Sequence, residues 1–154
     1  MPMNWRNPVH ILASGFGSGL APRAPGTFGT IAAIPIVLLA QFLPVWWYVG
    51  VTVLMFVAGI FICGRAARDW GVSDHPAIVW DEFVGLLVTM SAAPVGAVWL
   101  LAGFVLFRLF DIAKPWPICS LDRRVHGGFG IMLDDVVAGV FAAVILTLGA
   151  RWLS

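Results

Sequence analysis

The chain has 154 residues, of which 60% are hydrophobic and 11% are charged, and its mean hydropathy is +0.95. Soluble globular proteins carry about 25% charged residues, so this composition predicts an integral membrane protein, formed by a single domain over residues 1–154. The formal net charge of +1, without a basic stripe, argues against a nucleic-acid-binding protein. The two cysteines, Cys63 and Cys119, lie far apart and indicate neither a disulfide framework nor a zinc site.

The N-terminal region is rich in glycine and proline over residues 14–30, which predicts a loop rather than a regular helix. In one interpretation the loop is a phosphate cradle. Its glycines let backbone N–H groups approach a phosphate, an arginine adds positive charge and a threonine caps the next helix. The other interpretation is a connector at the membrane surface, and the pattern alone leaves both open. The residues of the predicted cradle are Gly17, Arg23, Gly26, and Thr27 or Thr30.

Hydrophobic segments make up most of the remaining chain and predict an all-α, polytopic membrane protein with four to five spans. The segments are residues 31–43, 45–63, 77–93, 95–110 and 131–150. The first is short for a straight span and contains Pro35, so it is either an extended span or one arm of a re-entrant hairpin. After the second segment, Arg65 and Asp69 are four residues apart, which predicts a surface ion pair.

The distribution of Lys and Arg predicts the orientation of these segments. Basic residues precede the first segment and follow the second and the fourth, whereas the connections between segments one and two and between three and four have none. The positive-inside rule therefore places the N-terminus in the cytoplasm. With five crossings, the acidic segment ends all face the cytoplasm and Arg151 faces outward. With four crossings, the C-terminus returns to the cytoplasm.

Acidic residues mark the ends of three hydrophobic segments. Asp81 and Glu82 open the third, Asp111 closes the fourth, and Asp134 and Asp135 open the fifth. A carboxylate entering a membrane helix costs about 2–3 kcal/mol or more, so it faces a protein interior, a counter-ion or a metal. Clustered oxygen ligands suit Mg²⁺, which predicts a magnesium-dependent phosphoryl site with both pairs as metal-binding residues and all five acids as catalytic residues. Adjacent residues lie about 100° apart on a helix, so one member of each pair is expected to ligate the ion directly and the other to lie behind it. Capping of helix N-termini explains one or two of these acids but not two pairs.

Basic residues and histidines lie near these acids. Arg108, Asp111 and Lys114 are spaced by three, which places them along one helix face. Arg108 and Lys114 are candidate phosphate ligands, and Arg108 is equally a candidate buried counter-ion. His75 and His126 are either proton donors to a leaving group or helix-boundary histidines without chemistry.

Four separated motifs resemble, in order and over nearly the whole chain, the bacterial phosphatidylglycerophosphatase A family. The motifs are Gly15–Gly19 with Pro25–Thr30, Ile78–Gly85, Phe107–Ile118 and Gly127–Gly139. The resemblance implies a magnesium-dependent enzyme of the bacterial inner membrane. It implies hydrolysis of the terminal phosphomonoester of phosphatidylglycerophosphate to phosphatidylglycerol and phosphate. The predicted topology places the active site of this multi-pass protein at the cytoplasmic face.

Two further hypotheses belong to other functional classes. A small ion or proton carrier would use the intramembrane acids as a relay, and it predicts acids spread through the depth of the membrane. A structural or assembly subunit leaves the acids unexplained. Small residues at 138, 139, 142 and 143 form a face that serves either packing within the chain or a homo-oligomer.

Overall fold

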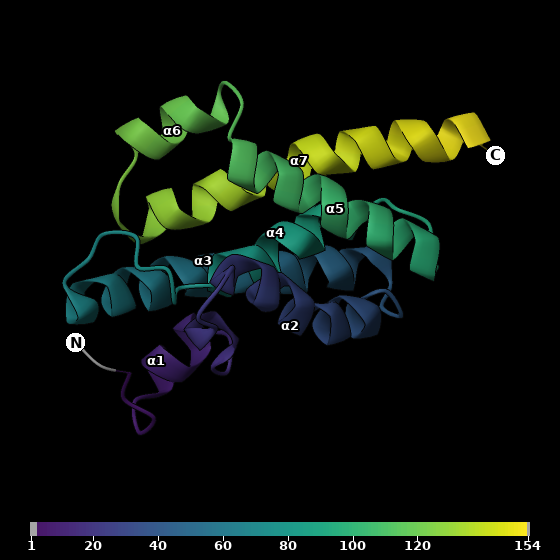
Figure 1. Cartoon of the computed structure of the whole chain (residues 1–154). Coiled ribbons are helices and arrows are strands. Elements are labelled where there is room, and N and C mark those ends of the chain that lie inside the picture. The colour runs from purple at the N-terminus through teal and green to yellow at the C-terminus, as the bar shows by residue number, and fades with distance from the viewer. Residues whose placement is uncertain (1–2, 154) are drawn as a thin grey trace.

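The structure is a computed structural model that describes residues 3–153, all of them in helices or connecting loops, with no strand in that range. The helices are α1 (Pro8–Ala13), the 3-10 helix η1 (Ser18–Leu20), α2 (Pro25–Ala40), α3 (Val45–Trp70), α4 (Trp80–Met90), α5 (Ala97–Ala113), α6 (Ile118–Arg124) and α7 (Gly127–Leu153). The prediction of an all-α fold is confirmed. The short helices α1 and α6 lie toward one end of the molecule, and α7 ends at the other (Figure 1).

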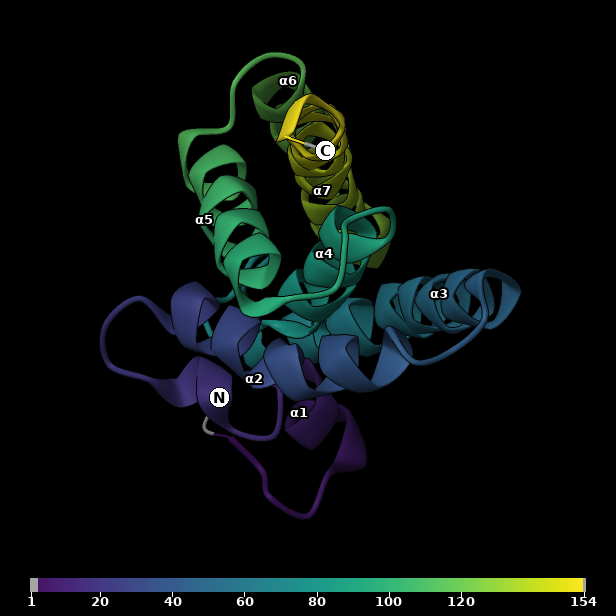
Figure 2. The same cartoon turned by 90° about the vertical axis from the view of Figure 1, so that its right-hand side faces the viewer.

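Helix α4 is the centre of the fold. It packs against α2, α3, α5 and α7, which surround it in the end-on view of Figure 2. Every residue of α4 except Val88 is buried. Its sequence is apolar around the whole circumference beyond the two acids at its start, and a helix of that kind is stable only when other helices cover it on all sides. Phe83, Leu86 and Leu87 supply much of the resulting core.

Two glycines bring α4 and α7 into close contact. A Cβ placed on Gly139 would lie 2.6 Å from the carbonyl oxygen of Gly85, so the two backbones nearly touch. Each glycine follows an acidic residue by one helical turn, Asp81 in α4 and Asp135 in α7. Because both helices begin at the same end of the bundle, the close crossing brings these two acids together. The small residues of α7 therefore pack within the chain at this crossing.

The outer sides of α2, α3, α5 and α7 carry large apolar side chains. Trp46, Phe61, Leu101 and Leu148 are each at least 60% exposed. Two described helices, α3 and α7, are long and apolar enough to cross a membrane. The lengths of the described helices therefore do not confirm the predicted count of four to five spans. The third predicted segment is helical only over the 11 residues of α4. At about 1.5 Å per residue, α4 covers about 16 Å of a hydrocarbon core that is about 30 Å thick.

The N-terminal glycine-rich region, residues 14–30, is more ordered than the sequence predicted, because it contains η1 and the first turn of α2. The N-cap of α2 is Ala24, whose side chain offers no cap, and the Thr30 hydroxyl instead donates to the carbonyl oxygen of Gly26 at 2.8 Å. The prediction of a threonine cap is therefore wrong. A Cβ placed on Gly15 would lie 2.7 Å from the Val79 side chain. The loop thus packs closely against the segment that leads into α4.

Candidate active site

A polar cavity of about 280 Å³ lies at the end of the bundle where α2, α4 and α7 begin and α5 ends. We call this cavity the acid pocket. Six of the eight acidic residues of the sequence line it, together with two cations. The acids are Asp74, Asp81, Glu82, Asp111, Asp134 and Asp135, and the cations are Arg108 and Lys114. The structure thus brings together all five acids that the sequence analysis selected, and both cations at helical spacing beside them.

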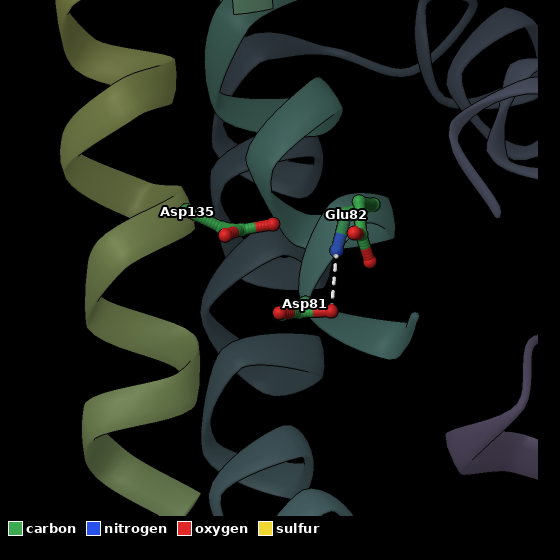
Figure 3. A group of neighbouring side chains, drawn as sticks. All are labelled: Asp81, Glu82 and Asp135. Atoms are coloured by element: carbon green, nitrogen blue, oxygen red, sulfur yellow. Dashed lines mark hydrogen bonds between the residues drawn. The ribbon is translucent and has the colours of Figure 1, made fainter. Parts of the chain in front are cut away.

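Three of these acids lie especially close to one another. Asp81, Glu82 and Asp135 each offer a carboxylate oxygen within 4.8 Å of the other two, and all three residues are buried. Figure 3 shows Asp135 pointing from α7 toward the pair at the start of α4. The Glu82 backbone N–H donates to Asp81 Oδ1 at 3.1 Å, which orients that carboxylate. The arrangement follows from the glycine crossing one turn further along both helices.

Buried oxygens without partners identify what this group of acids requires. Glu82 Oε2, Asp134 Oδ1 and Asp135 Oδ2 are buried and find no hydrogen-bond partner among residues 3–153. Burying a carboxylate without compensation is strongly unfavourable, so such groups pair with a cation or take up a proton. An oxygen-only donor set of this kind fits Mg²⁺. The residues present therefore fit the metal that the sequence predicted.

Arg108 crosses the pocket from α5 toward α4. Its Nη1 donates to Asp111 and lies 3.6 Å from Glu82 Oε1, and its side chain is only 13% exposed. It therefore acts as the partly buried counter-ion that the sequence analysis considered. Its Nε is buried without a hydrogen-bond partner in the described chain. The guanidinium thus retains a donor that its two carboxylate neighbours do not use.

Lys114 is the C-cap residue of α5 and lines the pocket. Its Nζ lies 3.9 Å from Asp111 Oδ1 and 3.8 Å from oxygens of both Asp122 and Asp134. Partial burial works against its charge, but the carboxylates around it, led by Asp111, outweigh that effect and raise the pKa of Lys114 above its ordinary value. Lys114 therefore stays protonated throughout the physiological pH range. Each of its three carboxylates lies beyond direct hydrogen-bond distance.

The first turn of α2 approaches the pocket through Gly26. A Cβ at this position would lie 2.7 Å from Glu82 Oε1 and 3.0 Å from both terminal nitrogens of Arg108. A side chain here would displace one of those groups. The N-terminus of a helix also carries a partial positive charge, which favours anions. Gly26 thus belongs to the lining of the acid pocket.

The other residues of the predicted cradle lie apart from the acid pocket. Thr27 is half-buried in the first turn of α2, Arg23 is exposed, and Gly17 packs against the Trp5 ring. None of the three belongs to the lining of the pocket within residues 3–153. The glycine-rich loop therefore supports the approach to α4 in this structure, and of its predicted ligands Gly26 lines the pocket.

Asp74 and His75 line the pocket without having been selected as site residues, although His75 was a candidate proton donor. His75 Nδ1 accepts a hydrogen bond from the Ala77 backbone N–H at 3.1 Å, so its Nε2 carries the ring hydrogen. His126 lies in a neighbouring cavity beside Asp122 and Asp134. The signal in the sequence was the position of Asp74-His75 before a hydrophobic segment, but only the folded loop shows that it turns inward.

Residues 11–150 match the family model described as Phosphatidylglycerophosphatase A. The chain belongs to this family. Phosphatidylglycerophosphatase A of Escherichia coli strain K12 is 53% identical over 148 residues, which cover 95% of this chain and 86% of the relative. The protein of the same name from Haemophilus influenzae is 45% identical over 149 residues, covering 96% and 91%. No solved structure matches the chain.

A further relative, from Bacteroides thetaiotaomicron, has a name that describes a phosphatidylinositol-3-phosphatase. It is 37% identical over 150 residues, which cover 92% of both chains. The family and its closely similar members make the chain a phosphatase, and the resemblance seen in the sequence motifs is confirmed.

Proposed function

We propose that the chain is a magnesium-dependent lipid phosphatase that hydrolyses the terminal phosphomonoester of phosphatidylglycerophosphate to phosphatidylglycerol and phosphate. The observation that carries this proposal is the acid pocket, in which six carboxylates and two cations share one polar cavity. The names of the two most similar relatives described above support the headgroup. The motif resemblance points to the same substrate.

Asp81, Glu82 and Asp135 are the residues that would hold Mg²⁺, with Asp134 beside them. Their oxygens lie within 4.8 Å of one another, and Glu82 and Asp135 each have an oxygen without a hydrogen-bond partner in the described chain. Six carboxylates facing two cations leave an excess of negative charge that a divalent ion reduces. When bound, Mg²⁺ supplies positive charge that polarises a phosphate and lowers the pKa of a bound water.

Arg108 and Lys114 would bind the phosphate oxygens of the substrate. Arg108 presents a planar fork of N–H donors that suits a phosphate, and Lys114 adds a point charge. Gly26 leaves space for the phosphate at the positive end of α2. His75 lines the same cavity and offers Nε2–H for donation to a substrate oxygen. These groups hold and orient the phosphomonoester beside the acids.

The protein would lie in the bacterial inner membrane as a multi-pass protein, with its acid pocket at the cytoplasmic surface. The exposed apolar sides of α2, α3, α5 and α7 support this placement because they suit contact with lipid tails. Basic residues near the pocket end support the orientation by the positive-inside rule. The pocket would then face the leaflet in which the phosphorylated headgroup is presented.

The ion-carrier hypothesis has less support. A relay needs acids at successive depths along the helices. Six of the eight acidic residues instead gather in one cavity at one end of the bundle. The buried helix surfaces that lead away from it are apolar, as Leu86 in α4 and Ala142 in α7 illustrate.

The proposal is tested by phosphate release from phosphatidylglycerophosphate by the purified full-length chain in detergent, with Mg²⁺ and with EDTA. We expect release with Mg²⁺, loss with EDTA and recovery when excess Mg²⁺ is restored. Equal release in EDTA would exclude the metal. No release, under conditions in which an established lipid phosphatase is active, would reject the hydrolase itself.

Metal binding has a readout that does not depend on turnover. A ligand present at about 100 times its Kd stabilises the folded state by about 2.7 kcal/mol, so Mg²⁺ should raise the thermal unfolding midpoint of the chain. The same titration on Asp135→Asn should leave the midpoint nearly unchanged. A monovalent salt at matched ionic strength is the control for general charge screening.

A further inference from the structure

The acid pocket has room for a phosphorylated headgroup but not for the rest of a lipid. Its volume is about 280 Å³ and its lining is dominated by charged side chains. Each acyl chain of a phospholipid extends across about half of a hydrocarbon core that is about 30 Å thick. The diacylglycerol part of the substrate must therefore leave the pocket along the surface of one of the helices that line it. This inference rests on the proposed function.

Most of the helix faces that lead away from the pocket are closed. The residue four or seven positions beyond a pocket residue lies on the same helix face. Following that rule from Gly26 in α2, Glu82 in α4 and Asp135 in α7 leads in each case into the core. Ala33 follows Gly26, Leu86 follows Glu82, and Ala142 follows Asp135, and all three are 0% exposed. A lipid tail cannot lie along these faces because other helices cover them.

Helix α5 differs from the other three. Leu101 lies seven residues before Arg108 and so on the same helix face, and Val105 and Val98 flank Leu101 four residues after and three residues before it. These three side chains are 54%, 66% and 77% exposed. Arg108 is itself only 13% exposed and reaches Glu82 in the pocket. One side of α5 therefore passes from the buried phosphate ligand to an open apolar surface.

The geometry around α5 also fits a lipid tail in length and position. From Arg108 to Val98 the helix rises by about 15 Å at about 1.5 Å per residue, which is half of a hydrocarbon core about 30 Å thick. Helices α2 and α5 both pack on α4 but not closely on each other over the described residues. Helix α5 lies at the edge of the bundle in Figure 2, so its outer side faces the surroundings.

We infer that the stripe Val98–Leu101–Val105 on α5 is the binding site, here called the α5 seat, of an acyl chain of the lipid substrate. Arg108, at the end of the stripe nearest the acid pocket, binds the phosphate. The substrate enters sideways from the membrane, its headgroup passing Arg108 into the acid pocket while the tail remains on α5. The stripe thereby selects phosphomonoesters that carry long acyl chains over soluble ones.

A photoreactive lipid tests where the tail lies. The probe is a phosphonate analogue of phosphatidylglycerophosphate, which has a P–C bond and resists hydrolysis, with a diazirine in the middle of one acyl chain. Phosphatidylcholine with the same chain is the control lipid. In liposomes containing the full chain, the phosphonate should label the stripe severalfold more than phosphatidylcholine does. Leu54 on α3 is the control position, because its side chain is 68% exposed and that of Leu101 is 66% exposed. Both lipids should label Leu54 equally.

The measured quantity is the ratio of labelling by the phosphonate to labelling by phosphatidylcholine. An equal ratio on α5 and α3, or a higher ratio on α2 or α7 than on α5, would refute the α5 seat. A kinetic comparison supplies a second test with a matched control. Leu101→Ala should raise KM severalfold for the long-chain substrate and leave KM for a dihexanoyl substrate unchanged, whereas Leu54→Ala should alter neither. Hydrolysis by the parent protein, measured alongside, separates the two proposals. Turnover without the α5 preference rejects the seat alone, and absence of turnover rejects the phosphatase.

Discussion

Two groups of charged side chains in this molecule are built in opposite ways. In the first, Asp69 accepts hydrogen bonds from His10 Nε2 at 3.1 Å and from Arg65 Nε at 2.9 Å, so both of its oxygens are occupied. His10 Nδ1 in turn accepts from the Asn4 backbone N–H at 3.2 Å. In the second group, the acid pocket, carboxylates outnumber cations and buried oxygens remain without partners in the described chain.

The two groups therefore have different roles. Hydrogen bonds that satisfy every partner hold α1 against the end of α3, and the first group needs nothing further. The acid pocket is stable only with an added cation or added protons, because carboxylates buried together repel one another. An unfilled requirement for positive charge marks a binding site, whereas a satisfied network marks a structural joint.

The largest expected effect is on the acids of the second group. Asp81→Asn and Asp135→Asn should each lower phosphate release by at least about 100-fold, because each removes a proposed metal ligand and even residues outside the ligand set typically contribute 10–100-fold. The same substitutions should leave the unfolding midpoint without Mg²⁺ unchanged or raise it, because they remove a buried charge. The measurements are phosphate release and thermal unfolding in detergent.

That combination separates a binding site from a structural joint. If Asp81→Asn and Asp135→Asn lowered the midpoint in EDTA by several degrees, their carboxylates would belong to a satisfied structural network. The acid pocket would then not differ from the Asp69 group in the way described above. Activity within a few-fold of the parent would remove them from the metal site. Asp134→Asn is a useful comparison for these two variants, because the Asp134 carboxylate already has a cation nearby, with Lys114 Nζ at 3.8 Å. We expect its activity loss to be smaller.

A second prediction concerns the space that Gly26 leaves in the pocket. Gly26→Ala places a methyl group 2.7 Å from Glu82 Oε1 and 3.0 Å from Arg108, so one of them must move. We expect a loss of about 10–100-fold in kcat/KM, since misplaced ligands of a catalytic site have effects of this size. Gly50→Ala in α3 is the matched control, because nothing lies within 4 Å of that position. Equal activity of the two variants would show that Gly26 has no role.

The sequence predicted these groups unevenly, for physical reasons. Helical spacing predicted the Arg65–Asp69 pair, which is confirmed at 2.9 Å. The partner His10 was missed because 59 residues separate it from Asp69, and no local pattern joins them. The meeting of the acids was foreseen, because alternating segments return their ends to one side. The loop carrying Asp74 was not, since its inward turn depends on tertiary contacts.

Segment lengths were the weakest part of the sequence analysis. Hydropathy makes residues 77–93 one continuous apolar segment, yet the helix is confined to Trp80–Met90. A buried helix and a lipid-facing helix have the same apolar composition, so hydropathy does not distinguish them. The sequence also does not distinguish glycines of different roles. Gly26 at the pocket and Gly15 against Val79 belong to one glycine-rich run.

A third prediction concerns Lys114, whose role is attraction rather than metal binding. Lys114→Gln should raise KM by at least about 10-fold with a smaller change in kcat, since one charge-assisted contact to phosphate is worth about 1.5–3 kcal/mol. The raised pKa keeps the lysine charged at neutral pH, so the effect should persist between pH 6 and about 9. Arg124→Gln, an exposed basic residue outside the pocket lining, is the control. An unchanged KM in Lys114→Gln would exclude the phosphate contact.

The smallest effect on activity is expected in the first group, and it should appear in stability instead. Asp69→Asn weakens the hydrogen bond from His10, whose side chain is 5% exposed, and should lower the thermal unfolding midpoint. Arg65→Gln should cost less, because its side chain is 61% exposed and surface ion pairs contribute little. Thermal unfolding measures both. Phosphate release per folded molecule should equal that of the parent, because Asp69 takes no part in the acid pocket's lining within the described residues. A loss of activity without a loss of stability in Asp69→Asn would make the joint part of the catalytic machinery and erase the distinction between the two groups.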